Sequence, residues 1–302
     1  MGNSAYKAAV IGLGSMGWGA AVSLLKAGIE TVGVDIRDNV LEHFSAQGGR
    51  ITKSPAEAAG GCDAVLVFVV NAEQTETVLF GPDGAVSAAP KGCVFLTCAT
   101  TPPEFAEQIA GRLIGEGMLV VDAPVSGGAA KALDGDMTIM ASGSDEAFEK
   151  AKPATDAIAN KVYRLGSAAG AGSRVKMINQ LLAGVHIAAT AEAMTLGIKS
   201  GVDPKTLYDV ICASAGQSWM FENRGPHIVE GDYDPKSAVD IFVKDLGIVT
   251  SEGERQAFPL PLAETALQQF KAAQDAGLGR QDDAAVAKIY AKRGNINLPG
   301  QN

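Results

Sequence analysis

The sequence predicts an α/β fold, in which an N-terminal doubly wound parallel sheet is followed by an all-α domain. Three observations support this class. Short β-branched runs alternate with helix-length segments through the first half of the chain, this alternation stops near Gly166, and a long stretch without proline begins at Arg174. We therefore expect two domains, residues 1–168 and 169–302, joined by a long helix.

The apolar runs of the first half have the length and composition of buried strands. Because helix-sized segments separate them, they are typical of βαβ units, whose parallel sheet is covered by helices on both faces. The predicted strands are residues 8–14, 31–35, 64–70, 93–100, 118–125 and 136–143.

The second half of the chain has a helical pattern. Residues 174–199 contain no proline and, before Gly197 near the end, one interior glycine, Gly184, which predicts a helix of about seven turns. Its apolar residues spread round most of the circumference, as in a helix buried between domains or subunits, so we expect a homodimer or a homotetramer. Further helices, with prolines near their starts, are expected at residues 204–214, 236–254 and 259–276.

Composition narrows the classes of partner. Of the 302 residues, 47% are apolar and 20% are charged, which is typical of a soluble globular protein. A formal net charge of −9 gives no field that would attract phosphate backbones, so we expect no nucleic-acid partner. The longest apolar run, residues 64–70, is too short to cross a bilayer, and the first residues lack a basic and apolar leader. We therefore expect no membrane association and a cytoplasmic location.

Neither the cysteines nor the histidines indicate a metal site or a disulfide framework. The four cysteines show no Cys-x-x-Cys spacing, and three of them lie in or beside apolar runs, where buried thiols are common. None of the three histidines has a His or Cys at ligand spacing, so we predict no metal. His186 falls within the long apolar helix and is expected to be a packed residue rather than a catalytic base.

The stretch VIGLGSMGWG, residues 10–19, has the Gly-x-Gly-x-x-Gly spacing of a dinucleotide-binding loop. That spacing alone is a weak signal, but here a β-branched strand precedes it and a helical run follows it. In this context Gly12 permits a tight turn, Gly14 the close approach of a pyrophosphate, and Gly17 the packing of helix on strand, which predicts a Rossmann domain. The pyrophosphate would lie at the helix N-terminus. The predicted cofactor contacts in the loop are Gly12, Leu13, Gly14, Ser15, Met16 and Gly17.

An acidic residue at the end of the second strand favours NAD as the cofactor. Asp35 lies 18 residues beyond Gly17, where a carboxylate can accept hydrogen bonds from both ribose hydroxyls of NAD and repel the 2′-phosphate of NADP. Arg37, two positions on, could soften this preference. The alternative is that Asp35 is a solvated acid in a turn.

Two segments could supply the chemistry of hydride transfer from an alcohol. Lys176 stands at the start of the long helix, with Asn179 three residues on and on the same face. A lysine in partly apolar surroundings beside a cationic nicotinamide ring can have its pKa lowered enough to transfer protons, but Lys176 could also be a solvated helix cation. Ser126, Gly127 and Gly128 follow a strand and could hold a substrate carboxylate, or could form an ordinary turn.

Four segments of the chain resemble signatures of the β-hydroxyacid dehydrogenase family. GLGSMG (12–17) resembles its cofactor loop, DAPVSGG (122–128) its substrate signature, GAGSRVKMINQ (170–180) its catalytic segment and FVKDLG (242–247) its late Lys-Asp motif. The match spans nearly the whole chain. The resemblance implies NAD-dependent oxidation of a small hydroxy acid.

The resemblance also implies roles for individual residues. Lys176 would be the general acid/base, Asn179 would orient the substrate, and residues 126–128 would hold its carboxylate. Lys244 would close over the cofactor from the helical domain, and Thr100 would contact the nicotinamide or its ribose.

One departure from the family pattern follows the third predicted strand. Many members have Leu-Pro there, whereas this chain reads Val69, Val70 and Asn71. We expect Val69 and Val70 to keep a backbone contact to the cofactor, without the restriction that proline places on the turn.

Within the family, the segment AGQSWMFENRGP (215–226) and the general run of the chain look most like members that oxidise the 2-hydroxyl of L-threonate, a four-carbon sugar acid, to 2-oxo-tetronate. Such a substrate needs several hydrogen-bonding groups, since each unmatched buried polar group costs roughly 1–3 kcal/mol. The alternatives are tartronate semialdehyde or glycerate, 3-hydroxyisobutyrate, reduction of an imine or small aldehyde acid, and, in a different class, a non-catalytic NAD-binding protein. The candidate residues for the pocket are Asn179, Gln180, Gln217, Ser218 and Trp219.

Overall fold

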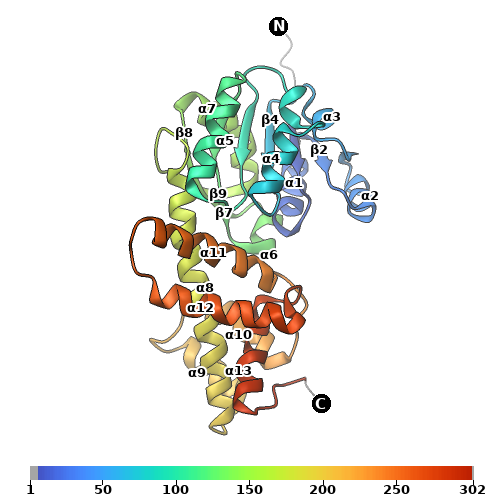
Figure 1. The fold of residues 1–302 in the computed structure, drawn as a ribbon. Helices are drawn as coiled ribbons and strands as arrows, with labels where there is room; N and C mark the ends of the chain where they lie inside the picture. The colour runs from blue at the N-terminus through green and yellow to red at the C-terminus, as the bar shows by residue number, and fades with distance from the viewer. Residues whose placement is uncertain (1–5, 301–302) are drawn as a thin grey trace. The chain divides into compact units, whose positions relative to one another are not determined.

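A nine-stranded sheet organises the first half of the chain, within residues 6–300 that the computed structural model describes (Figure 1). The strand order is β3-β2-β1-β4-β5-β6-β8-β7, with β9 beside β8. All pairs from β3 to β6 are parallel, so the predicted α/β fold is confirmed. The strands are β1 (Lys7–Ile11), β2 (Glu30–Val34), β3 (Arg50–Thr52), β4 (Ala64–Val67), β5 (Val94–Thr97), β6 (Leu119–Asp122), β7 (Val125–Ser126), β8 (Met137–Gly143) and β9 (Ala159–Arg164).

The strand β8 departs from the predicted parallel arrangement. It runs antiparallel to β6 through the pair Val121–Gly143 and antiparallel to β7 through the pair Val125–Ile139. The chain enters β8 at the edge of the sheet where β6 ends, so no crossover helix is needed. The apolar run at 136–143 correctly indicated a strand, but the expectation that it continues the parallel sheet was wrong.

Helices cover both faces of this sheet. In β1, Ala8 and Val10 belong to one buried cluster and Ala9 and Ile11 to another, which is the period of two expected of a strand covered on both sides. The first cluster includes α1 (Ser15–Lys26) and α7 (Asp145–Ile158), and the second includes α3 (Pro55–Ala59) and α5 (Pro103–Gly115). The other helices of this half are α2 (Asp38–Ala46), α4 (Ala72–Phe80), α6 (Gly128–Leu133) and the short turn η1 (Ala85–Ser87).

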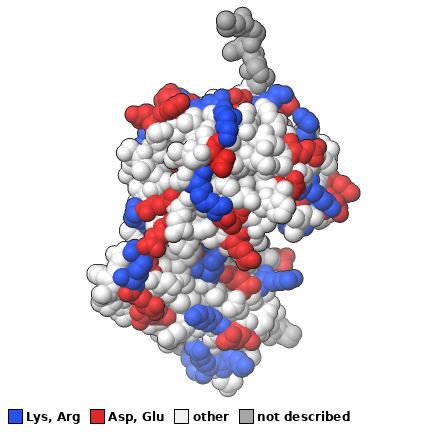
Figure 2. All heavy atoms as spheres, turned by 45° about the horizontal axis from the view of Figure 1, so that its top comes forward, with Lys and Arg blue, Asp and Glu red and all other residues white. Residues whose placement is uncertain are grey.

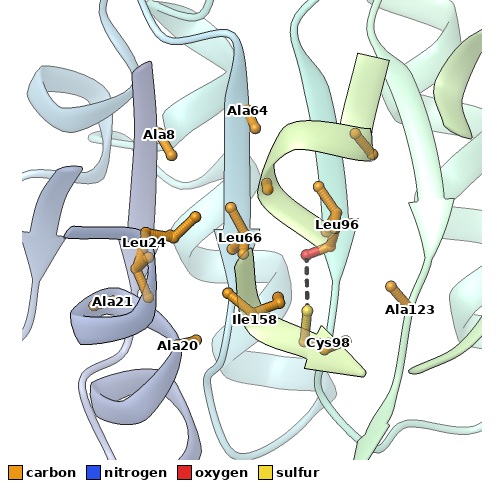
Figure 3. Close-up of a cluster of buried hydrophobic side chains, with 14 of the residues drawn as sticks. Ala8, Ala20, Ala21, Leu24, Ala64, Leu66, Leu96, Cys98, Ala123 and Ile158 are labelled. Carbon is orange, nitrogen blue, oxygen red and sulfur yellow. Dashed lines mark hydrogen bonds between the residues drawn. The ribbon is translucent and has the colours of Figure 1, made fainter. Parts of the chain in front are cut away.

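Small side chains bring α1 close to the sheet in the first cluster. Figure 3 shows Ala20, Ala21 and Leu24 of α1 beside Ala8 and Leu66 of the strands, all of them buried. Close packing of this kind leaves little room for added atoms. The same cluster contains one of three buried free thiols, which agrees with the expectation for cysteines in apolar runs; the three are Cys62, Cys93 and Cys98.

The chain divides into two compact units, Met1–Lys176 and Met177–Asn302. The division falls inside the long helix α8 (Ala171–Lys199). The second unit is built from helices, three of which match predicted segments: α9 (Pro204–Cys212), α11 (Val239–Arg255) and α12 (Pro261–Ala273). Two further helices, α10 (Trp219–Glu230) and α13 (Ala287–Gly294), and the turns η2 (Gln274–Leu278) and η3 (Asp283–Val286), had not been predicted.

The core of the second unit combines aromatic stacking with a buried ion pair. The rings of Phe242 and Phe270 stack with centroids 5.3 Å apart. Arg224 lies in α10, one of the unpredicted helices. This helix contains Pro226, and a proline inside a segment argues against a helix in a sequence pattern. The guanidinium donates to both oxygens of the buried Asp283, at 2.5 and 2.9 Å, and so ties α10 to η3.

The helix α8 is only partly buried within the single chain. It is the one helix among the described residues that is long and apolar enough to cross a membrane by length and composition, a test that core helices also pass. Only 44% of its most apolar window is buried. Ile178, Leu182 and Leu196 are more than half exposed, at 55%, 51% and 64%.

Charged side chains of both signs are interspersed over the face shown in Figure 2. Neighbouring opposite charges form surface pairs, such as Lys7 with Glu30 at 3.1 Å and Lys150 with Asp63 at 2.6 Å. On that face, therefore, the net negative charge is not gathered into one acidic patch.

The close contact between α1 and α6 predicts a costly glycine substitution. A Cβ on Gly19 would lie 2.5 Å from backbone atoms of Ala132 and Leu133, which no side-chain rotation can relieve. We expect Gly19→Ala to lower the free energy of unfolding by about 1–3 kcal/mol, measured by urea denaturation. The control is Gly111→Ala in α5, which meets nothing within 4 Å and is expected to gain up to about 1 kcal/mol from helix propensity. Equal effects of the two substitutions would contradict the packing argument.

Candidate active site

The last residues of six parallel strands lie in register at one edge of the sheet, where Thr52 of β3 pairs with Val34 of β2. Ile11 of β1 pairs with Val34 and with Val67, Val67 pairs with Thr97, and Thr97 pairs with Asp122. The loops that leave this edge therefore begin side by side. The strand order reverses between β1 and β4, and parallel sheets of this kind bind nucleotides at such a point. The loops carry the predicted site residues Gly12, Asp35, Val69, Thr100 and Ser126.

The three glycines after β1 have different surroundings. Gly12 has φ +94°, and a Cβ there would lie 2.9 Å from the Phe68 carbonyl oxygen. A Cβ on Gly17 would lie 1.9 Å from the Gly12 carbonyl oxygen, whereas a Cβ on Gly14 would meet nothing within 4 Å. The packing of the chain therefore requires the first and third glycines, and the second leaves the backbone open to a ligand.

The helix α1 begins at this loop without a side-chain cap. Its N-cap residue is Gly14, and its first turn contains no acidic residue. The first helical hydrogen bond runs from the Trp18 amide to the Gly14 carbonyl oxygen at 2.8 Å. The amides of Ser15, Met16 and Gly17 precede it at the positive end of the helix, so they fit the pyrophosphate of a dinucleotide.

Asp35 is buried and already engaged by its neighbours. Its oxygens accept from the Leu13 amide at 2.9 Å, the Arg37 amide at 3.0 Å, and the Arg37 Nε and Nη2 atoms at 2.8 Å each. Burial alone would raise the pKa of Asp35, but the hydrogen bonds from Arg37 and Leu13 together lower it below its ordinary value. Four donors occupy the acceptor positions of this carboxylate, so a ribose hydroxyl must share them or displace the half-exposed Arg37 side chain.

A cavity of about 480 Å³ adjoins the glycine loop. It is lined by Gly14 and Ser15 of the loop, by Trp18, and by residues of α2 and α6, among them Val40 and Leu133. The Trp18 ring also meets the Phe44 ring edge-on, with centroids 6.0 Å apart. Trp18 thus forms a wall beside the phosphate loop.

Two side chains restrict the turn after β4, where the family pattern has proline. Asn71 caps α4, and its Oδ1 atom accepts from the Gln74 amide at 2.9 Å. The Gln74 side-chain oxygen in turn accepts from the Val70 amide at 2.9 Å. This reciprocal pair resembles a capping box and shapes the turn by hydrogen bonds rather than by a fixed φ. Val69 and Val70 lie at its start, and Val70 is 48% exposed.

The predicted carboxylate-binding segment follows β6. Ser126 pairs with Thr138 of β8, and Gly127 and Gly128 have φ of +138° and +77°. These are conformations that favour glycine, and they turn the backbone away from the sheet. Thr100 lies three residues beyond the end of the adjacent β5, in the segment that leads to α5.

Lys176 lies near the start of α8 with only 7% of its surface exposed. Ser173, one turn earlier, donates to Asp122 through its amide at 2.9 Å and its hydroxyl at 2.7 Å. Residues three apart share a helix face, so Lys176 lies on the face of α8 that meets the end of β6. A side chain with so little exposure is not solvated, so Lys176 is not the solvated helix cation of the alternative interpretation.

A chain of polar side chains connects Asn179 with Lys244 in the second unit. Asn179 Nδ2 donates to Gln180 Oε1 at 2.9 Å, and Gln180 Nε2 donates to Asp245 Oδ2 at 2.5 Å. Lys244 Nζ donates to the other oxygen of Asp245. The structure thus brings together two residues that the sequence placed 65 positions apart.

The other substrate candidates of the second unit have different surroundings. The Ser218 hydroxyl accepts from the Phe221 amide at 3.0 Å and caps α10, which leaves its proton as the group a ligand could use. Trp219 is 49% exposed, and Gln217 is also exposed. These three residues do not form a buried polar pocket within the unit.

Two buried carboxylates had no predicted role, although both lie in the quoted signatures. Asp122 ends an apolar strand and is 1% exposed, and Asp245 lies on the buried face of α11 at 2%. The available signal was an acidic residue in an apolar pattern, because a buried carboxylate must be paired. Sequence gives no partner for either residue.

Residues 6–300 contain no cluster of three or more His, Cys, Asp or Glu side chains that could hold a metal ion. The polar residues around the strand ends bind one another and the backbone instead, as Asp35 and Asp122 do.

Comparisons with known proteins agree with this geometry. Residues 7–166 match the family model for the NAD-binding domain of 6-phosphogluconate dehydrogenase. Residues 170–290 match the model described as the NAD-binding domain of NADP-dependent 3-hydroxyisobutyrate dehydrogenase.

Individual relatives match over nearly their whole length. The chain is 58% identical to an L-threonate dehydrogenase of Cupriavidus necator, covering 97% of each chain, and 49% identical to that of Escherichia coli K12, covering 98% of each. A crystal structure titled 3-hydroxyisobutyrate dehydrogenase, from Salmonella typhimurium, matches with a TM-score of 0.91 at 49% identity, over 94% of this chain and 99% of that one. The chain therefore belongs to the β-hydroxyacid dehydrogenase family and is an NAD-dependent hydroxyacid dehydrogenase.

Proposed function

We propose that this enzyme oxidises the 2-hydroxyl of L-threonate to a ketone, which gives 2-oxo-tetronate (2-dehydro-L-erythronate). The observation that carries the proposal is that five relatives named L-threonate dehydrogenase are 49–58% identical over at least 97% of both chains. Relatives named for other substrates, 2-(hydroxymethyl)glutarate and L-serine, are 35% and 32% identical. Membership of a family of dehydrogenases sets aside the alternative of a non-catalytic NAD-binding protein.

In the proposed reaction Lys176 accepts the proton of the substrate hydroxyl. The hydrogen on carbon 2 leaves with the electron pair of its C–H bond, as a hydride. The hydroxyl proton goes to the Lys176 amine, and the C=O bond of the ketone forms. NAD, when bound, supplies the acceptor for the hydride. The Lys176 side chain is 7% exposed, so it is shielded from bulk water, which supports a place in a site that excludes water.

Two other groups orient the substrate in this proposal. The backbone amides at Ser126, Gly127 and Gly128 hold the carboxylate; in support, Gly127 and Gly128 have positive φ angles and carry no Cβ that could cover their amides. Asn179 binds a hydroxyl, one helical turn beyond Lys176.

We assign NAD rather than NADP as the preferred cofactor. The uncapped start of α1 supports binding of the pyrophosphate, and the ionised Asp35 supports recognition of the ribose diol. The proposed contacts are Gly12, Leu13, Gly14, Ser15, Met16, Gly17, Asp35, Val69, Val70, Thr100 and Lys244.

A homodimer or homotetramer and a cytoplasmic location stay predictions. The exposed apolar side chains of α8, such as Leu182 and Leu196, support the oligomer because burying them against another subunit would remove apolar surface from water.

The substrate is tested by NADH formation with a panel of C3 to C6 hydroxy and aldonic acids. We expect L-threonate to give the highest kcat/KM. The panel includes glycerate and 3-hydroxyisobutyrate as alternatives, and a reductive arm with tartronate semialdehyde, an imine and NADH. If L-threonate is inert while 3-hydroxyisobutyrate reacts, the sugar-acid proposal is wrong.

The role of Lys176 is tested by Lys176→Ala. We expect this variant to bind NADH as the wild type does but to lose about 10²-fold or more of kcat, because no base remains to take the hydroxyl proton. Fluorescence titration gives the NADH affinity, and steady-state assays give kcat. Unchanged turnover would overturn the assigned mechanism.

The cofactor preference is tested by substitutions at Asp35 and Arg37. We expect Asp35→Ala to reduce the NAD over NADP preference by about tenfold or more, because it removes charge-assisted hydrogen bonds worth roughly 1.5–3 kcal/mol. Arg37→Ala is the matched control: it frees the carboxylate for the ribose and should strengthen the preference. A preference that moves in the same direction in both variants would refute the role given to Asp35.

A further inference from the structure

One buried carboxylate holds the start of the helix that carries Lys176. Asp122 Oδ2 accepts from the Gly170 amide and the Ser173 amide, each at 2.9 Å, and Asp122 Oδ1 accepts from the Ser173 hydroxyl at 2.7 Å. Ser142, which is fully buried, donates its hydroxyl to the same carboxylate at 3.2 Å and accepts from the Gly172 amide at 3.0 Å. Together these contacts use the amide of Gly170, which directly precedes α8, and the amides of Gly172 and Ser173 in its first turn.

The backbone at Gly172, in the first turn of α8, also lies very close to the backbone of β6 and β8. A Cβ on Gly172 would lie 2.3 Å from the Met140 carbonyl oxygen and 2.9 Å from that of Asp122. Asp122 and Ser142 are themselves a pair in the ladder between β6 and β8. The first turn of α8 is therefore fixed to two strands by side-chain hydrogen bonds and by close backbone contact.

The Asp122 carboxylate connects two parts of the proposed site within the first unit, the carboxylate-binding segment that begins at Ser126 and the base Lys176. Four residues beyond Asp122 along the chain is Ser126, where the proposed carboxylate-binding segment begins. Ser173 precedes Lys176 by three residues, or about 4.5 Å of helix rise on the same face. A shift of the first turn of α8 would move the Lys176 amine relative to that segment.

We propose that Asp122 is a positioning residue, which sets the place of the Lys176 amine relative to Ser126–Gly128 by clamping the first turn of α8, with Ser142 and Ser173 as its partners. The proposal rests on the function proposed above for Lys176. Asp122 does not itself touch the substrate in this account, and its effect comes from geometry. A displacement of about 1 Å at a reacting group can cost roughly 10²-fold in rate.

The test separates positioning from simple stabilisation by using kcat per NADH-binding site. Protein that has unfolded binds no NADH, so a purely structural role lowers the number of sites and leaves kcat per site unchanged. We expect Asp122→Ala to lower kcat per site by about 10- to 100-fold, with the NADH dissociation constant within about twofold of wild type. Ser173→Ala, which removes one hydrogen bond, should lower kcat per site by a smaller factor. It provides the test if Asp122→Ala does not fold.

Asp122→Asn is the conservative variant. Its amide oxygen can take the place of Oδ2, and its NH₂ group can donate to the Ser173 hydroxyl, which accepts as readily as it donates. We expect this variant to keep kcat per site within about threefold of wild type, because a geometric role needs the contacts rather than the charge. A loss as large as that in Asp122→Ala would overturn positioning as the mechanism.

Ser144→Ala is the matched control for losing a helix anchor. Ser144 caps α7 by accepting from the Ala147 amide at 3.2 Å, and α7 carries no proposed site residue. Its kcat per site should be that of wild type. If Asp122→Ala and Ser173→Ala also keep wild-type kcat per site while Lys176→Ala loses turnover, the positioning role of Asp122 is wrong and the proposed role of Lys176 stands. If Lys176→Ala keeps turnover, the proposed function of Lys176 fails first.

Discussion

The register of the parallel ladder is the constraint on which the candidate site depends. Six parallel strands end on the same row of residues, so the chain leaves the sheet six times at one edge. Ladder hydrogen bonds fix each exit point, and a register shift of one residue would turn every following side chain to the other face. The loops differ in sequence and in task, but the sheet determines where each begins.

Backbone packing, more than side chains, then shapes the cofactor part of this edge. Gly12 and Gly17 lie against backbone carbonyl oxygens, so neither tolerates a Cβ, and α1 is held close to the end of β1 as a result. The same loop donates its Leu13 amide to the Asp35 carboxylate and leads into the uncapped start of α1. The loop, the helix start and the acidic residue thus form one rigid arrangement before any cofactor binds.

Local patterns allowed much of this to be predicted from the sequence. Strand, glycine loop and helix are consecutive, and Asp35 follows at a characteristic distance, so the Rossmann fold required no knowledge of distant contacts. The direction of β8 was not predictable in this way, because run length identifies a strand but not its partner. Nor was the contact between Asp122 and Ser173, which are 51 residues apart. The engagement of Asp35 by Arg37 depends on a rotamer, which no residue pattern specifies.

The donor-to-acceptor direction of the hydrogen bonds that connect Asn179 with Lys244 bears on which part of a substrate each site residue can bind. Asp245 accepts from the Gln180 NH₂ group, which leaves the Gln180 oxygen for Asn179. Asn179 donates to Gln180 through one Nδ2–H, which leaves its second Nδ2–H and its Oδ1 atom for other partners. An amide oxygen suits a substrate hydroxyl, which donates, and repels a carboxylate, which does not. Backbone amides such as those of Gly127 and Gly128 can only donate, so in the proposed site they suit a carboxylate. A side chain with both a free donor and a free acceptor suits a substrate with hydroxyls beyond the reacting one, as in the proposed sugar acid.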